Sequence, residues 1–92
     1  MSEKSIVKRI MDAAKQRGWM AIKIHGGPFQ MSGLPDILCL RHGRAAWIEA
    51  KRPGNSPTRI QEHRMRELVQ FGCPVTVACS VGDAVEFLES FS

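Results

Sequence analysis

The chain has 92 residues, and its thirteen Lys and Arg outnumber nine Asp and Glu to give a formal net charge of +4. No apolar run approaches the ~18 residues that a membrane-spanning helix requires, and no apolar signal segment follows the N-terminus. The composition therefore argues against a membrane or secreted protein and predicts one cytoplasmic domain over residues 1–92. All thirteen basic residues lie within residues 1–66, whereas residues 67–92 contain four acids and no base. This asymmetry favours nucleic acid as a partner, although small proteins are also mildly basic for solubility alone.

The first predicted element is a helix over residues 2–17, in which apolar residues recur at helical spacing until a glycine ends the pattern. A strand rich in β-forming residues follows over residues 19–24. The next segment, His25–Gly33, is too rich in glycine to continue the strand and is predicted to be a loop. Its apolar residues Phe29 and Met31 either fold over the protein's own core or insert at a distorted or unpaired nucleotide.

Two apolar runs of strand length, residues 36–41 and 44–51, are separated by a two-residue turn signal and predict a β-hairpin. Counting outward from a two-residue loop pairs Asp36 with Glu49, and period-2 alternation places Lys51 on the same face. Two opposed carboxylates repel each other, and a bound cation removes that objection. Their hard oxygen atoms suit Mg²⁺ or Mn²⁺. The alternative is a solvated strand face with an ordinary ion pair.

A loop over residues 52–57 leads to a second helix that ends at Gly72. Its N-cap is either Thr58, which forms a capping-box pattern with Gln61, or Ser56, which would leave Gln61 free to face the site. The residues that this helix is predicted to bury are Ile60, Met65, Leu68 and Val69.

A fourth strand over residues 74–79 and a last helix from Ser80 complete the predicted elements. Because a helix connects the third and fourth strands, these strands are predicted to be parallel neighbours. The order of elements indicates an α/β fold with a mixed sheet flanked by helices. The last helix carries Phe87, Leu88 and Phe91, more apolar surface than one face requires, which predicts part of an interface.

Three motifs carry a resemblance to a known family: Gly33-Leu34-Pro35-Asp36-Ile37, Ile48-Glu49-Ala50-Lys51 and Thr58-x-x-Gln61. Together they resemble the virus-type replication-repair nuclease (VRR-NUC) family of the PD-(D/E)xK nuclease superfamily. The resemblance implies a restriction-endonuclease-like αβββαβ core with an extra C-terminal helix. The short chain is similar to stand-alone, phage-type members, which resemble Holliday-junction resolvases, and it would act in the host cytoplasm if phage-encoded.

The resemblance also implies roles for the motif residues. The implied metal ligands are Asp36, Glu49 and the backbone carbonyl of Ala50. Lys51 would orient or deprotonate the attacking water and offset charge on the phosphate, and Gln61 would position substrate or water. Glu3 would approach the metal from the first helix, as an acid does in related nucleases. A negative side chain in the first turn of a helix is also favourable by itself.

Basic and polar side chains around these motifs are candidates for phosphate contacts, which fix a protein on DNA without reading its sequence. These candidates are Lys4, Lys8, His25, Ser32, Arg52, Arg59 and Arg64. Each charged one is individually also explained as a solvated surface residue.

The sequence as a whole predicts a metal-dependent endodeoxyribonuclease that cuts branched DNA. It would use Mg²⁺, with Mn²⁺ as a substitute, no organic cofactor and no membrane partner. One active site cannot cut two strands, so a branched junction as substrate implies a homodimer. Two alternatives remain open: a restriction-like nuclease that reads a duplex sequence, and a non-catalytic nucleic-acid-binding module on the same fold.

Overall fold

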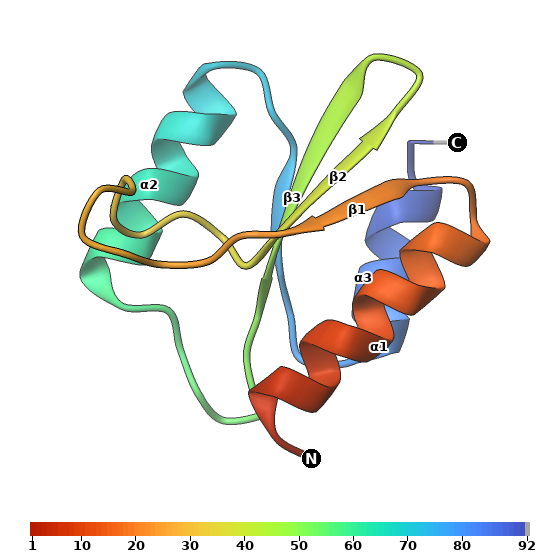
Figure 1. Cartoon of the computed structure of the whole chain (residues 1–92), viewed down its shortest axis with the longest axis horizontal. Coiled ribbons are helices and arrows are strands. Elements are labelled where there is room, and N and C mark those ends of the chain that lie inside the picture. Colours follow the sequence, from red (N-terminus) through yellow and green to blue (C-terminus); the bar gives the residue numbers. More distant parts are fainter. Residues whose placement is uncertain (92) are drawn as a thin grey trace.

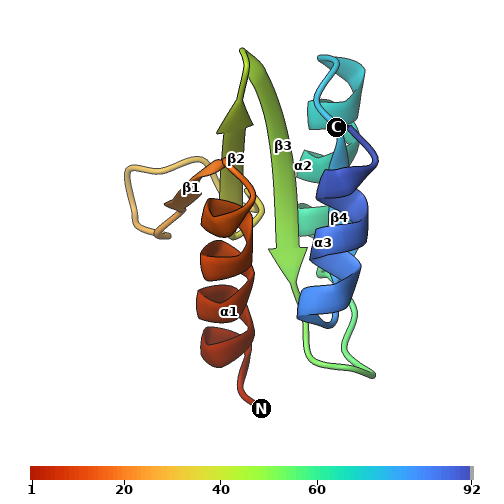
Figure 2. The same cartoon turned by 90° about the vertical axis from the view of Figure 1, so that its right-hand side faces the viewer.

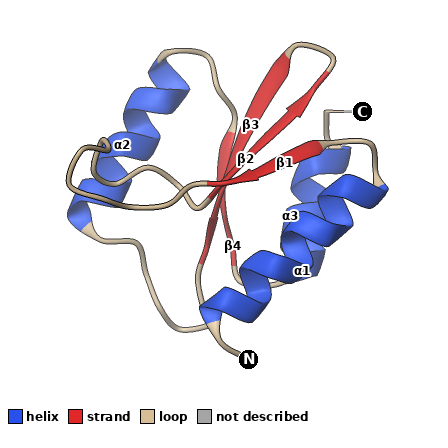
Figure 3. Ribbon diagram, in the orientation of Figure 1, coloured by secondary structure: helices blue, strands red, loops and turns tan. Residues whose placement is uncertain are grey.

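The structure, a computed structural model, describes residues 1–91. Its seven elements follow the predicted order: α1 (Glu3–Gln16), β1 (Met20–Lys23), β2 (Ile37–Arg41), β3 (Arg44–Ala50), α2 (Arg59–Gln70), β4 (Val75–Ala78) and α3 (Val81–Glu89). The strands form one sheet in the order β1-β2-β3-β4, with helices on both sides (Figure 3). β1, β2 and β3 are antiparallel neighbours, whereas β4 is parallel to β3. The predicted α/β fold with a mixed sheet is confirmed.

The β2–β3 hairpin has the predicted register. Arg41 pairs with Arg44 across a two-residue loop, in which His42 and Gly43 have positive φ angles of 51° and 76°. Positive φ at both loop residues is typical of a type I′ turn, whose twist matches that of the flanking strands. The ladder runs outward to the pair Ile37 and Ile48. The next residues outward are Asp36 and Glu49.

The strands are slightly shorter than predicted. β2 begins one residue after Asp36, β3 ends one residue before Lys51, and β1 is shorter by one residue at each end. Hydrogen bonds nevertheless continue past these ends: Ile24 N–H donates to the Asp36 carbonyl at 2.8 Å, and Lys51 N–H donates to the Ala78 carbonyl at 3.0 Å. The main chains of Asp36 and Lys51 are therefore held by the sheet although neither residue belongs to a strand.

The core lies on one face of the sheet, beneath α1 and α3 (Figures 1 and 2). Ile10 from α1, Leu88 from α3, Ile37 from β2 and Ile48 from β3 are among its largest fully buried side chains. Burying each such side chain contributes roughly 1.5–3 kcal/mol, so this face supplies most of the apolar stabilisation. No helix within residues 1–91 is long and apolar enough to span a bilayer.

The opposite face of the sheet is covered by α2, with the loop between β1 and β2 beside it (Figure 1). The whole of α2 lies within the described residues, and none of its side chains is buried. The prediction that Ile60 and Val69 are buried is wrong, because they are 44% and 59% exposed. Val69 lies beside β4, which is an edge strand, so no further strand within residues 1–91 covers it, whereas Ile60 lies against the loop residue Gly33.

The apolar residues at the end of α3 pack against the core. Leu88 is only 1% exposed, and Phe87 and Phe91 pack against the core cluster. The two phenylalanine rings also contact each other edge to face, with centroids 5.0 Å apart. Phe87 and Phe91 stay partly exposed, and part of an interface at this place stays a prediction.

Candidate active site

Asp36 is held at the edge of β2 by hydrogen bonds to two neighbouring strands. Its carbonyl accepts the bond from Ile24 described above. Its carboxylate oxygen Oδ2 accepts a hydrogen bond of 2.9 Å from the Ala50 N–H. This second bond was not predicted from the sequence. The hairpin register, extended outward by one residue, places Asp36 opposite Glu49 and so near Ala50. The bond fixes the Asp36 side chain against the end of β3.

Among residues 1–91, Glu49 is the one charged residue that is buried, with 2% of its surface exposed. It lies on the α2 side of β3, because its neighbours Ile48 and Ala50 fill the core on the other side. Its oxygen Oε2 accepts a hydrogen bond of 3.1 Å from Gln61 Nε2 and lies 3.5 Å from Lys51 Nζ. Its other oxygen, Oε1, is buried and finds no hydrogen-bond partner among residues 1–91. Such an oxygen is costly to bury unpaired, so it marks a place where a cation would be stabilising.

Burial raises the pKa of Glu49 from 4.5 to about 7, and the negative charge of Asp36 contributes to this rise. Lys51 acts in the opposite direction without cancelling the two effects. The carboxyl group is therefore partly protonated near neutral pH. A cation that binds beside it competes with that proton.

Gln61 uses both ends of its side-chain amide. Its Oε1 accepts a hydrogen bond of 2.8 Å from the Thr58 N–H, and the Thr58 hydroxyl accepts one from the Gln61 N–H, which completes a capping box. Its Nε2 donates to Glu49. Thr58 is therefore the N-cap, and the alternative in which Ser56 caps the helix is wrong. Gln61 therefore caps the helix and faces the site at the same time: its Oε1 takes part in the capping box, and its Nε2 contacts Glu49.

Asp36 and Glu49 are the acidic pair at this site. Residues 1–91 contain no group of three or more His, Cys, Asp or Glu side chains that could hold a metal, so Glu3 does not join them. Glu3 lies in the first turn of α1, where its charge is favourable to the helix. A pair of carboxylates fits a hard divalent cation such as Mg²⁺, which keeps several waters and takes few protein ligands. The unpartnered Glu49 oxygen agrees with that donor set.

The comparisons with known proteins point to the same chemistry. A family model described as archaeal Holliday junction resolvase (Hjc) matches residues 2–79. The chain belongs to the Hjc family. Membership makes it a nuclease, as the motifs around Asp36 and Glu49 predicted. A search of curated proteins found no match.

Two solved structures resemble this Hjc-family chain over almost its full length. One, called "VRR_NUC domain", is 22% identical with a TM-score of 0.82, and the alignment covers 98% of this chain and 97% of that one. Another, called "VRR_NUC domain protein", is 20% identical with a TM-score of 0.79 and coverages of 97% and 86%. The likeness shows that the fold is that of VRR-NUC domains and confirms the predicted resemblance.

The predicted phosphate contacts of this Hjc-family chain fall into two groups. The exposed ones are Lys4, Lys8, His25, Arg52 and Arg59. Ser32 is exposed too, but its main-chain carbonyl accepts a hydrogen bond of 2.9 Å from Arg64 Nε. The Arg64 side chain is only 16% exposed and is also paired with Glu67. The first group can reach a bound nucleic acid, whereas the Arg64 guanidinium is already engaged within the chain.

The loop that precedes Asp36 exposes its aromatic residue. Phe29 is fully exposed and Met31 is 59% exposed, so the loop tip does not fold over the protein's own core. Figure 1 shows this loop leaving the end of β1 and running to the side of α2. The alternative in which Phe29 and Met31 fold over the protein's own core is therefore wrong, and both side chains are free to contact a ligand.

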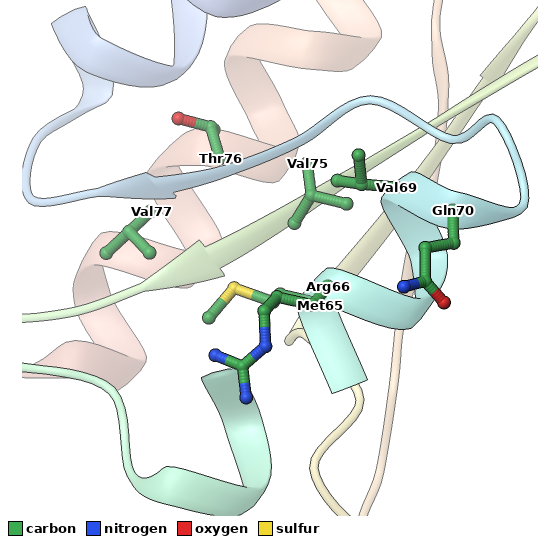
Figure 4. A pocket seen from close by; sticks show the side chains of 7 residues that line it. All are labelled: Met65, Arg66, Val69, Gln70, Val75, Thr76 and Val77. Atoms are coloured by element: carbon green, nitrogen blue, oxygen red, sulfur yellow. The ribbon is translucent and has the colours of Figure 1, made fainter. Parts of the chain in front are cut away.

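A groove of about 390 Å³ lies between the C-terminal half of α2 and β4. Figure 4 shows that Met65 and Val69 from α2 face Val75 and Val77 from β4 across it. Its lining comes from the C-terminal half of α2, whereas Gln61 meets Glu49 near the N-terminal end of the helix. The groove is therefore a mostly apolar surface on the free edge of the sheet, and it extends to Val77, the register partner of Glu49.

Proposed function

We propose that this chain is a divalent-metal-dependent, structure-specific endonuclease that hydrolyses phosphodiester bonds in branched DNA such as Holliday junctions. The observation that carries the proposal is the buried Glu49 carboxylate, which has an unpartnered oxygen and lies beside Lys51 and Gln61 in a chain of the Hjc family. An ordinary surface ion pair is solvated and contributes about 0–1 kcal/mol. Glu49 is only 2% exposed, so a merely structural ion pair is a poor explanation for it.

Asp36, Glu49 and the backbone carbonyl of Ala50 are the proposed ligands of Mg²⁺, for which Mn²⁺ would substitute. Carboxylate and carbonyl oxygens are the ligands that these ions prefer. When bound, the ion would polarise the scissile phosphate and lower the pKa of a coordinated water. The hydrogen bond from Ala50 N–H holds Asp36 Oδ2, which leaves Oδ1 as the oxygen that we expect to face the ion.

Lys51 supplies a positive charge at the same place. Its side chain is only 12% exposed, with Nζ 3.5 Å from Glu49 Oε2. In this partly desolvated position the ammonium group can orient the attacking water and stabilise the charge that develops on the phosphate, whereas the neutral amine would accept the proton of that water. Gln61 restrains the Glu49 carboxylate through Nε2, so that the carboxylate keeps one orientation during the reaction.

The exposed side chains around the site support a substrate that is recognised by shape. Lys4, Lys8, Arg52 and Arg59 would contact phosphates, which position a protein on DNA without reading its sequence. Phe29 is fully exposed on the loop that leads to Asp36. An aromatic side chain can stack on an unpaired base for about 1–3 kcal/mol, and a branch point offers such bases more readily than a continuous duplex does.

The protein would act on a junction as a homodimer, because resolving a four-way junction requires two incisions and this chain has one acidic pair. The groove between α2 and β4 is the surface that we assign to a second copy. Its lining is mostly apolar, and Val69 at this place is 59% exposed. It also lies on the free edge of the sheet, because β4 has no strand on its outer side among the described residues.

The decisive experiment compares Lys51→Ala with Lys15→Ala, an exposed lysine on α1, on a four-way junction and on a linear duplex, with and without Mg²⁺. The wild type and Lys15→Ala are expected to cut the junction in Mg²⁺ and to leave the linear duplex intact. Lys51→Ala is expected to lose at least about 100-fold in kcat, the usual loss when an acid–base group is removed. Junction binding by this variant should persist.

Equal cleavage by Lys51→Ala and the wild type would contradict the assigned role of Lys51. Cleavage of particular linear sequences would favour a restriction-like nuclease. Tight binding by the wild type without any cleavage in Mg²⁺ or Mn²⁺ would favour a non-catalytic binding module.

A further inference from the structure

The loop of residues 25–34 and the first turns of α2 contact each other, although about thirty residues separate them along the chain. Figure 1 shows the loop lying beside the helix. Two contacts join them: a close backbone approach of Gly33 to Ile60, and a hydrogen bond from Arg64 to Ser32. We call these four residues the loop–helix contact.

Gly33 makes the close approach possible. It has a φ angle of +81°, and a Cβ atom added there would lie 2.6 Å from the Ile60 carbonyl oxygen. Real Cβ atoms are essentially never that close to another heavy atom, and a residue with a side chain would also be strained at this φ. The end of the loop is therefore seated directly on the backbone of the first turn of α2.

Arg64 holds the same place from the helix side. Its Nε donates to the Ser32 carbonyl at 2.9 Å, and its guanidinium pairs with Glu67 one turn further along α2. The side chain is 16% exposed, whereas Arg59 on the same helix is exposed. Arg64 thus uses Nη1 on Glu67 and Nε on the backbone that leads through Leu34 and Pro35 to Asp36.

This contact matters because little else restrains that end of α2. None of the side chains of α2 is buried, so apolar packing fixes the helix only loosely on the sheet. Gln61 nevertheless has to reach Glu49 with an Nε2 to Oε2 distance of 3.1 Å. Ile60 precedes Gln61, and Arg64 lies three residues beyond it, which places the loop–helix contact on both sides of the residue that needs positioning.

We infer that Arg64 is a positioning residue, which holds the loop before Asp36 against α2 and so keeps Asp36, Glu49 and Gln61 in one arrangement. It acts through the backbone of Ser32 and makes no contact with DNA phosphates. The inference rests on the proposed nuclease function of the site for its effect on catalysis. The loop–helix contact itself can be measured without any DNA.

The test compares Arg64→Ala with two matched arginine variants. Arg59→Ala removes an exposed candidate phosphate contact, and Arg17→Ala removes an arginine that pairs with Glu89 on the far side of the molecule. The first readout is amide hydrogen exchange of residues 25–34 and 59–64 in the absence of DNA and metal. Arg64→Ala should raise exchange at both segments at least about tenfold, as expected when a local contact is lost, and the other two variants should leave it unchanged.

The second readout separates positioning from phosphate binding. A lost phosphate contact lowers the slope of log affinity against log salt by about 1. Arg59→Ala should show that change. Arg64→Ala should retain the wild-type slope and KM for a four-way junction, while its kcat falls about 10- to 100-fold because the site is misplaced.

Three results would overturn the inference: unchanged exchange in Arg64→Ala, a slope reduced by about 1 in that variant, or an unchanged kcat. If Arg64→Ala does not fold, Gly33→Ala perturbs the same contact from the loop side and should give the same pattern of exchange. If the wild type cuts no DNA at all, the proposed function fails, and the exchange measurement still decides whether Arg64 holds the loop.

Discussion

Replacing Glu49 by Gln is expected to stabilise the metal-free protein at alkaline pH. Gln has the shape of a protonated Glu, and its amide oxygen can still accept the bond from Gln61. In the wild type the pKa of Glu49 is raised from 4.5 to about 7, chiefly by burial and then by Asp36. Because the folded protein holds this proton more tightly than the unfolded chain, the contribution of Glu49 to stability is present below about pH 4.5. It is lost as the pH rises through about 7.

The size of this loss follows from the difference between the two pKa values. At ~1.4 kcal/mol for each pKa unit, the difference corresponds to about 3 kcal/mol between pH 4 and pH 9. A loss of this size is a large fraction of the 5–15 kcal/mol or so that stabilises typical folded domains. It should therefore be visible in a simple unfolding experiment.

The assay is urea unfolding in EDTA at several pH values between 4 and 9, for the wild type, Glu49→Gln and Glu62→Gln. Glu62 is a suitable control because it lies on α2 with 52% of its side chain exposed, and its replacement should change the unfolding free energy by less than about 0.5 kcal/mol. Subtracting the unfolding free energy of the wild type from that of Glu49→Gln removes the contributions of all ionisable groups that the two proteins share. This difference should shift by about 3 kcal/mol in favour of Glu49→Gln as the pH rises.

Mg²⁺ provides an independent arm of the same assay. At pH 8 and about 100 times its dissociation constant, a metal ion that binds only the folded state adds about 2.7 kcal/mol. The wild type should gain this stability, and Glu49→Gln, which lacks the charged ligand, should gain much less. If the unfolding free energies of the wild type and Glu49→Gln instead change in parallel with pH, burial of the Glu49 charge does not destabilise the folded protein and the reasoning is refuted.

Two further predictions concern the substrate and the assembly. Phe29→Ala should weaken binding to a four-way junction about 5- to 100-fold, the equivalent of one lost base stack, whereas Phe71→Ala, also an exposed phenylalanine, should bind as the wild type does. A 2-aminopurine at the branch point would report the stacking, and equal binding by the two variants would exclude a role for Phe29. Val69→Asp should convert a dimer to a monomer in sedimentation velocity and uncouple the two nicks of a junction, and an unchanged sedimentation coefficient would move the interface elsewhere.

The parts of the fold that were predictable from sequence are those that local rules determine. His42-Gly43 allows a type I′ turn, and this turn alone fixes which residues of β2 and β3 face each other. The pairing of Asp36 with the end of β3 follows from that register. The parallel placement of β4 beside β3 follows from the helix between them.

The features that the sequence left open or predicted wrongly depend on contacts that periodicity does not reveal. Helical periodicity indicates which side of α2 is apolar, but it does not show that Val69 lies beside the edge strand β4 and Ile60 beside the loop residue Gly33, where both stay exposed. For Arg64 the sequence indicates a charged surface residue, and it does not reveal the hydrogen bond to the Ser32 carbonyl. For Thr58 and Ser56 the sequence offers two helix starts of similar quality, and the capping box formed with Gln61 selects one of them.

The double use of the Gln61 amide restricts how chains with this arrangement can diverge. Glutamate at the same position of a capping box would preserve the helix start, but it would turn a third carboxylate toward Glu49 in place of a donor. Asparagine would be one methylene too short to join Thr58 and Glu49 together. The spacing from Thr58 to Gln61 is likewise fixed, whereas the exposed segment Arg52–Ser56 can gain or lose residues, provided that the helix still starts at the same point above the sheet. Among related chains, insertions between β3 and α2 should therefore occur before Thr58 and not between Thr58 and Gln61.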